Sequence, residues 1–266
     1  MAVVLAVTNQ KGGVGKTTTS VNLAASVAAM RRNVLLIDLD PQGNATMGSG
    51  IDKHDIEASI YDVLIEDLPI GEATMDVESA GYALVPANVD LTGAELELMD
   101  LPRREHRLQD ALVAARDQYD YIFIDCPPSL SLLTINGLVA ADAVLIPMQC
   151  EYYALEGLSA LVNTISRITS NLNPGLGIEG IVRTMHDPRN SLTLEVSRQL
   201  TDHFGTKVFN TVIPRNVRLA EAPSYGLPVL YYDRQSRGAR AYLALASELV
   251  RRHSDVPAAE EQYDGR

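Results

Sequence analysis

The sequence predicts an α/β fold built on a doubly wound, mostly parallel sheet. Short apolar segments recur along the chain and are expected to form buried strands, whereas the stretches between them place apolar residues at the spacing of one helix face. Such alternation from one end of a chain to the other is typical of parallel sheets covered by helices on both faces. The expected strands are 2–7, 34–38, 82–86, 121–125, 143–148, 178–185 and 207–213.

Length and composition agree with a single soluble domain. The chain has 266 residues, of which 46% are hydrophobic and 21% are charged. We expect one domain over residues 1–253, followed by an acidic, disordered tail over 254–266. The apolar runs are too short to cross a membrane and the first residues are expected to form a strand, so a cytoplasmic location is predicted. Two cysteines, Cys126 and Cys150, indicate neither a disulfide framework nor a metal cluster.

A glycine-rich loop lies between the first strand and the first helix. It predicts a phosphate site, because unpaired N–H groups at a helix N-terminus attract anions and glycines allow close approach. Lys16 is expected on the β and γ phosphates of a nucleotide, and the Thr17 hydroxyl on magnesium. A standard P-loop has glycine where this chain has Gln10, and here a second lysine, Lys11, follows. The expected nucleotide-binding residues of the loop are Lys11, Gly12, Gly13, Val14, Gly15, Lys16, Thr17 and Thr18.

Carboxylates follow two of the expected strands. Asp38 and Asp40 lie in the string DLDPQGN, and Asp125 stands before Cys126-Pro127-Pro128. Open α/β sheets bind ligands at the carboxyl ends of their strands, so these side chains are expected near the glycine-rich loop. Asp125 has the position of a Walker B carboxylate, which holds magnesium through water. Without the loop, an ordinary Asx turn would be the preferred explanation for Asp38 and Asp40.

These motifs resemble a known family. KGGVGKTT, DLDPQGN and DCPP resemble the deviant Walker A P-loop ATPases of the ParA/MinD family, and TMHDPR, VIPRNVRLAEAPSYGLPV and YDRQSRGARAY resemble its chromosomal ParA (Soj-type) members. The resemblance covers nearly the whole chain and implies a fold of the P-loop NTPase type. It also implies slow hydrolysis of ATP with Mg²⁺, a homodimer on ATP binding, nonspecific binding to double-stranded DNA on the nucleoid, and stimulation by a ParB-like centromere-binding protein.

The resemblance implies roles for individual residues. Lys11 would reach phosphates bound by the other subunit, and Asp40 would help to position the attacking water, so that Lys11, Lys16 and Asp40 are the expected catalytic residues. Pro214 and Asn216 would line the adenine pocket, because a proline covers an apolar base and an amide both donates to and accepts from the base edge. The expected metal-site residues are Thr17, Asp38 and Asp125.

The charge distribution bears on DNA binding. The net charge of −12 argues against nucleic acid, but residues 181–252 carry 11 Lys and Arg against 6 Asp and Glu, whereas residues 1–180 carry 10 against 24. Arg189 and Arg218, in the basic segment, match family positions implicated in nonspecific DNA contact. Scattered arginines also form ordinary solvated surfaces, and Asp187, Glu221 and Asp233 lie among them. No signal supports sequence-specific recognition of DNA.

Other functions remain open. A MinD-like ATPase would bind membrane through its last helix, but acids follow the helix expected over 238–253 and anionic lipid would repel them, so no membrane binding is expected. A metabolic P-loop enzyme would act on a small substrate. An electron-transfer ATPase would need cysteines at a dimer face. The other expected helices are 60–65, within a surface excursion over 45–80, then 91–101, 103–119 with a solvated basic first turn, 131–141, 152–172 and 192–204.

Overall fold

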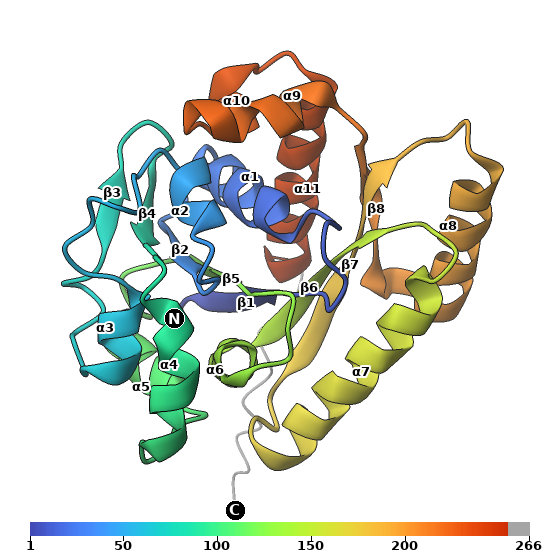
Figure 1. Ribbon diagram of the computed structural model, residues 1–266. Helices are drawn as coiled ribbons and strands as arrows, with labels where there is room; N and C mark the ends of the chain where they lie inside the picture. Colours follow the sequence, from blue (N-terminus) through green and yellow to red (C-terminus); the bar gives the residue numbers. More distant parts are fainter. Residues whose placement is uncertain (255–266) are drawn as a thin grey trace, which may run out of the picture.

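The computed structural model describes residues 1–254. The described residues form an eight-stranded sheet in the order β3-β4-β2-β5-β1-β6-β7-β8 (Figure 1). Neighbouring strands are parallel except β3, which is antiparallel to β4. The predicted doubly wound, mostly parallel sheet is therefore confirmed, while the predicted tail lies outside the described residues beyond Ser254. The strands are β1 (Val3–Val7), β2 (Val34–Asp38), β3 (Met75–Val77), β4 (Tyr82–Val85), β5 (Tyr121–Asp125), β6 (Ala143–Gln149), β7 (Gly177–His186) and β8 (Val208–Pro214).

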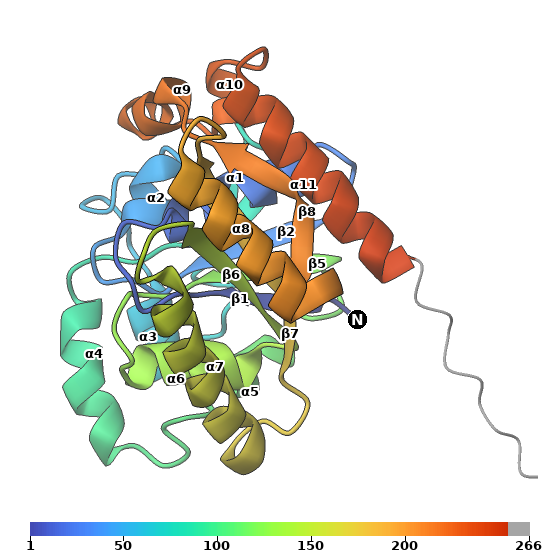
Figure 2. The same ribbon diagram turned by 90° about the vertical axis from the view of Figure 1, so that its right-hand side faces the viewer.

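Helices cover both faces of this sheet (Figures 1 and 2). In β1, Val4 and Ala6 belong to one buried cluster and Leu5 and Val7 to the other, so both faces of the strand are covered and every residue is apolar. The cluster around Leu5 packs against α1 and α11, and the other cluster against α5, α6 and α7. The helices are α1 (Lys16–Ala28), α2 (Asn44–Gly48), α3 (Ile60–Ile65), α4 (Leu91–Glu97), α5 (Arg107–Leu112), α6 (Leu132–Ala140), α7 (Ala154–Asn171), α8 (Ser191–Phe204), α9 (Val217–Glu221), α10 (Val229–Tyr232) and α11 (Arg237–Ser254).

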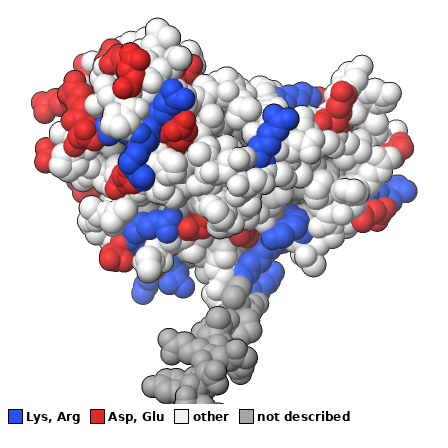
Figure 3. All heavy atoms as spheres, turned by 90° about the horizontal axis from the view of Figure 1, so that it is seen from below, with Lys and Arg blue, Asp and Glu red and all other residues white. Residues whose placement is uncertain are grey.

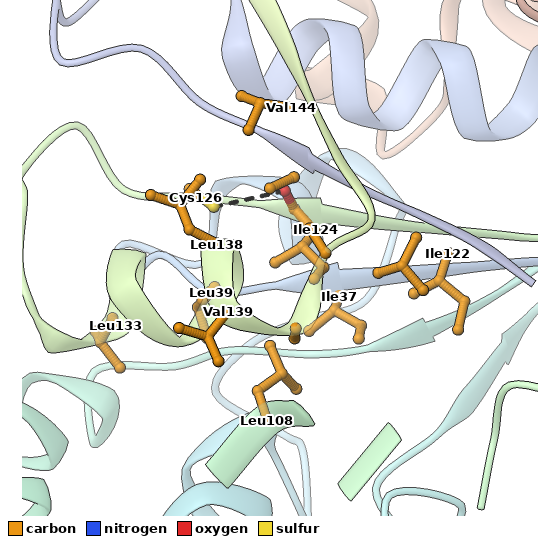
Figure 4. Packing of buried hydrophobic residues seen from close by; sticks show 14 of the residues in the cluster. Ile37, Leu39, Leu108, Ile122, Ile124, Cys126, Leu133, Leu138, Val139 and Val144 are labelled. Atoms are coloured by element: carbon orange, nitrogen blue, oxygen red, sulfur yellow. Dashed lines mark hydrogen bonds between the residues drawn. The ribbon is translucent and has the colours of Figure 1, made fainter. Parts of the chain in front are cut away.

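The packing of α6 on the sheet explains the cysteine that follows β5. Cys126 is buried and lies among Ile124, Leu138 and other apolar side chains (Figure 4). A Cβ on Gly137 of α6 would lie 2.9 Å from the Cys126 sulfur, so the helix can approach this closely only because it has glycine there. Burial raises the pKa of Cys126, which keeps the thiol protonated. Cys126 is thus a small core residue beside the cleft, as expected from the sequence.

Two sequence-based predictions for the segment 91–119 are wrong in part. The expected helix over 103–119 is only α5, because Arg103 has a positive φ of 53° and turns follow Leu112. Its basic start is not wholly solvated either: the Arg107 side chain is 14% exposed and donates to Leu64 O at 2.8 Å. The helix expected over 91–101 is an α-helix only as far as Glu97, and Leu98–Asp100 then form a 3₁₀ turn.

Helix α11 packs on the body of the domain along its apolar side. Tyr242, Leu245 and Leu249 are at most 1% exposed, and the helix runs beside β8 (Figure 2). The side that would have to face lipid in a membrane-binding helix is thus covered by protein. Among the described residues no helix is long and apolar enough to span a bilayer.

Candidate functional site

A cleft of about 940 Å³ opens at the carboxyl ends of the central strands. Parallel α/β sheets place their ligands at this edge, because here the loops that leave neighbouring strands converge. Its walls come from the glycine-rich loop after β1, the loops after β2 and β5, the end of β7, and the segment from β8 into α9. Among the residues that line it are Gly12, Gly13, Gly15, Lys16, Thr17, Thr18, Asp40, Pro128, Thr184, Pro214, Asn216 and Leu219.

The glycine-rich loop has the backbone that its sequence predicts. Gly13 and Gly15 have φ values of 73° and 87°, which L side chains rarely adopt, and α1 begins directly afterwards at Lys16. Thr184, at the end of β7, donates its hydroxyl to Val14 O at 2.7 Å and so holds the loop from the other side. The free N–H groups at the start of α1 therefore face the cleft and suit phosphate.

Lys16 lies in the wall of this cleft. The residue is 8% exposed, and its Nζ lies 3.5 Å from Lys11 O, within the same loop. Burial lowers the pKa of Lys16, although Asp125 and Asp40 raise it. A largely buried ammonium with few partners gains much from contact with a polyanion.

Asp125 ends β5 directly behind the loop. Ser20 Oγ donates to its Oδ1 at 2.8 Å, whereas its Oδ2 is buried and has no hydrogen-bond partner within residues 1–254. Burial and the nearby Asp38 raise the pKa of Asp125 to about 7, against the lowering effect of the neighbouring Thr17 and Ser20 hydroxyls. A buried carboxylate oxygen of this kind requires a cation or a proton.

Asp38 and Asp40 lie at the end of β2, beside Asp125. Thr46 donates both its N–H and its hydroxyl to Asp38 Oδ2, each at 2.8 Å. Burial raises the pKa of Asp38 to about 6 despite these bonds. Asp40 lines the cleft and accepts a hydrogen bond from Gln42 N at 3.0 Å.

The residues present fit a magnesium ion. Magnesium prefers hard oxygen ligands and keeps several waters, which carboxylates and hydroxyls can orient. The unpartnered Oδ2 of Asp125 and the Thr17 hydroxyl beside it supply such oxygens behind the phosphate loop. The acceptor-only chemistry of two adjacent buried carboxylates, Asp38 and Asp125, also favours a bound cation.

Lys11 is not brought into its own cleft. Its Nζ contacts Glu151 Oε2 at 2.5 Å, where β6 leads into α7, and both side chains are largely exposed. The backbone of the loop is fixed here by Asn9, whose Oδ1 accepts from Lys11 N at 3.0 Å and whose Nδ2 donates to Pro147 O at 2.9 Å. The ammonium therefore faces the rim and solvent.

Pro214 and Asn216 lie together in the cleft wall opposite the loop. Asn216 is the N-cap residue of α9, and its Oδ1 is buried without a hydrogen-bond partner among the described residues. This oxygen lies against α11, since a Cβ placed on Gly238 would be 3.2 Å from it. The amide and the proline fit the edge and the face of a purine base.

Arg189 and Arg218 lie outside the cleft and already have partners. Arg189 binds both carboxylate oxygens of Asp187, and Arg218 lies 2.7 Å from Glu221 and 3.3 Å from Asp233. Arg215, Arg234, Arg237 and Arg240 are among the arginines of this segment that form no ion pair within the described chain. Helix α9, which carries Arg218, lies at the top of Figure 1, so the face seen from below, where both signs of charge are intermixed (Figure 3), is a different one.

Several site residues were not predicted from the sequence. Thr184 and Met185 belong to the end of β7, and Met185 has a positive φ of 48°, which is uncommon for such a side chain. Thr46 and Ser20 support the carboxylates from α2 and α1. The rule that strand ends converge could have indicated Thr184, whereas nothing in the sequence distinguishes Ser20 or Thr46 from ordinary helix residues.

Comparisons with known proteins identify the family to which the chain belongs. A family profile described as an AAA domain matches residues 2–178. The chain is 53% identical over 250 residues to the sporulation initiation inhibitor protein Soj of Bacillus subtilis, covering 94% of this chain and 99% of that one. It is 52% identical over 254 residues to the chromosome partitioning protein ParA of Caulobacter vibrioides, covering 95% of both. The chain belongs to the ParA/Soj family.

A solved structure supports the chemistry of this ParA/Soj protein. The crystal structure of cobyrinic acid a,c-diamide synthase from Mycobacterium smegmatis, with bound ADP and magnesium, matches with a TM-score of 0.84 at 38% identity over 96% of both chains. The protein is an ATPase that uses ATP and Mg²⁺, and its fold is of the P-loop type. The predicted fold, activity and cofactors are thus confirmed.

Proposed function

We propose that this ParA-type ATPase segregates chromosomal or plasmid DNA. ATP and Mg²⁺ drive two copies into a sandwich dimer, the dimer binds DNA nonspecifically on the nucleoid, and a ParB-like centromere-binding protein stimulates hydrolysis and thereby releases the DNA. The observation that carries the proposal is Lys11, a loop lysine whose ammonium faces away from its own cleft. The identity to a protein named for chromosome partitioning supports the cellular role.

In this proposal catalysis consists of placement and charge neutralisation. Lys16 binds the β and γ phosphates from within the chain, and Lys11 binds the phosphates held by the partner copy. Asp40 orients the attacking water at the open side of the cleft. Thr17, Asp38 and Asp125 hold magnesium directly or through its waters, and the bound ion offsets phosphate charge.

The remaining wall of the cleft binds the base. Pro214 covers the adenine face, and the Asn216 amide donates to and accepts from the base edge. Both residues line the cleft, which supports the assignment. The nucleotide would therefore lie along the carboxyl edge of the sheet, with its phosphates at the glycine-rich loop and its base beside Pro214 and Asn216.

DNA binding is proposed to use the basic segment 181–252. Arg189 and Arg218 are the proposed DNA contacts. The same surface is extended by Arg215, Arg234, Arg237 and Arg240. Each phosphate contact is weak, so dimerisation, which doubles the number of contacts, can switch binding on by avidity. The bidentate contact of Arg189 to Asp187 means that phosphate must compete with a carboxylate already in place.

The test is DNA binding with ADP, with ATP and with a nonhydrolysable ATP analogue, each measured across a salt series on random-sequence duplexes. Binding that appears with ATP or the analogue, is absent with ADP and falls steeply with salt is expected. Equal binding in all three nucleotide states would contradict the switch. Tight binding to anionic liposomes without DNA binding would favour a membrane-cycling ATPase instead.

A second candidate is a metabolic enzyme that uses ATP to form a bond in a small substrate. The 38% identity to a protein described as cobyrinic acid a,c-diamide synthase favours it. An ATPase rate that rises with a small acid substrate and is indifferent to DNA would support this candidate. Identities of 52–53% to Soj and ParA make DNA segregation the preferred function.

A further inference from the structure

Gly238, in the first turn of α11, lies against α9 at a point where no side chain fits. A Cβ placed on Gly238 would lie 2.7 Å from Leu219 Cγ and 3.2 Å from Asn216 Oδ1. Gly238 has no positive φ, so its backbone conformation alone does not require glycine. The requirement comes from the close approach of α11 to the residues that form the wall of the cleft.

Both residues that Gly238 touches line the cleft. Leu219 is 8% exposed and Asn216 is the N-cap residue of the same short helix, α9. Since α9 has only five residues, its own hydrogen bonds do little to fix its position, so its packing on neighbouring elements, α11 among them, must do so. A displacement of Leu219 by an added methyl group would therefore move Asn216 as well.

The orientation of the Asn216 amide decides which base it accepts. Adenine carries an amino donor at position 6 whereas guanine carries an acceptor oxygen there, so an amide held in one orientation distinguishes the two bases. A site that forms a hydrogen bond with a group of adenine rejects guanine, which lacks that group, provided that the Asn216 amide is held in place.

We propose that Gly238 is a positioning residue for base recognition: the missing side chain lets α11 hold Asn216 and Leu219 where they select adenine over guanine. The inference rests on the proposed placement of adenine beside Asn216. It gives a role to the glycine of the string RQSRGARAY, of which the proposed DNA surface uses only the arginines.

The test compares Gly238→Ala with Gly157→Ala. Both glycines lie in helices, α11 and α7, so both substitutions raise helix propensity similarly, but a Cβ on Gly157 would meet nothing within 4 Å. Affinities for ATP, GTP and inorganic tripolyphosphate are measured by calorimetry with Mg²⁺. Gly238→Ala is expected to weaken ATP binding by about tenfold, as for one lost hydrogen bond, and to leave tripolyphosphate binding unchanged. Gly157→Ala should change none of the three.

Asn216→Ala separates failure of this inference from failure of the proposed base site. If Asn216→Ala leaves ATP binding unchanged, adenine does not lie beside Asn216. If Asn216→Ala weakens ATP binding but Gly238→Ala does not, Gly238 has no positioning role. Equal losses for ATP and tripolyphosphate in Gly238→Ala would overturn the inference too. If Gly238 acts through Asn216, the double variant should bind ATP no more weakly than Asn216→Ala alone.

Discussion

Lys11 Nζ and Glu151 Oε2 lie 2.5 Å apart, although 140 residues separate them in sequence. The side chains are 43% and 45% exposed, so water and salt screen the pair and its net contribution is about 0–1 kcal/mol. A triphosphate carries far more charge than one carboxylate. In the proposed dimer, Lys11 can therefore exchange Glu151 for phosphate of the second copy at little cost.

We first predict that Lys11→Ala separates nucleotide binding from dimerisation. The variant should bind ATP with an affinity within about threefold of the parent protein, because its ammonium lies outside its own cleft. It should remain monomeric with a nonhydrolysable analogue in chromatography with light scattering. Lys16→Ala is the comparison, and should lose ATP binding altogether. If Lys11→Ala loses ATP binding to the same extent, the role in the second subunit is wrong.

A second prediction concerns Asp40. Asp40→Ala should lower the hydrolysis rate by about 10²-fold or more, since misplacement of a reacting group by about 1 Å can cost that much. Nucleotide binding should persist, because Lys16 and the loop stay intact, and the dimer with ATP should become long-lived. Single-turnover hydrolysis and dimer lifetime are the measurements. A variant that stays monomeric with ATP would count against the role of Asp40.

A third prediction addresses the basic segment. Arg189→Glu combined with Arg218→Glu should weaken DNA binding and reduce the salt dependence by a slope of about 0.9 for each DNA phosphate that is no longer neutralised. Dimerisation should be unaffected, as neither side chain lines the cleft. Arg103→Glu is the matched control, because Arg103 also forms a surface ion pair, with Asp110, but belongs to the acidic part of the chain. Unchanged affinity at low salt would remove these two arginines from the DNA surface.

Alternation of apolar runs and helical spacing was enough to predict most of the sheet. The seven expected strands lie within one residue of the observed ends, because buried parallel strands are apolar on both faces and stand out in the sequence. The three-residue strand β3 was missed, since Met75 and Asp76 are exposed and carry no pattern. The helix expected over 103–119 is shorter at both ends, because the positive φ of Arg103 excludes its start and turns follow Leu112, which helical spacing does not reveal.

The candidate site was predictable where a motif fixes it and unpredictable where only packing does. The loop and the acids at the ends of β2 and β5 converge as expected, because strand order places these strands side by side. The contact of Lys11 with Glu151 joins loops that no sequence spacing relates. The same holds for Gly238, whose importance follows from the position of α9 rather than from any turn.

The raised pKa of Asp125 yields a fourth prediction, about stability without magnesium. The pKa of an unfolded aspartate is about 3.9, and burial raises the pKa of Asp125 in the folded protein to about 7. Between these values the folded state binds more protons, so the contribution of Asp125 to stability falls as pH rises from about 4 to about 7 and is constant above. Asp125→Asn should gain stability relative to the parent protein across that range in chemical denaturation. Parallel pH profiles for the two proteins would contradict it.

The last prediction concerns Glu248 of α11, which protects the free edge of the sheet. Strand β8 pairs only with β7 among the described strands, and Glu248 accepts from Asn210 N at 2.8 Å and from Thr211 N at 2.9 Å. Glu248→Ala would leave these N–H groups without their acceptor, so the free energy of unfolding should fall by about 1–3 kcal/mol at neutral pH. Glu156→Ala, at an exposed position on α7, is the control and should change stability by less than about 0.5 kcal/mol.

The same contacts give Glu248 a pH signature. Burial alone would raise its pKa, but hydrogen bonds from Thr211 and Asn210 outweigh burial and lower it. A lowered pKa means that the stabilisation is present above the unfolded value of about 4.3 and is lost as pH falls through the folded value. Glu248→Gln, which keeps one oxygen acceptor but no charge, should therefore be less stable than the parent at pH 7, and the gap should narrow in acid. A gap that stays constant down to the acid transition would show that the charge of Glu248 contributes nothing at this edge.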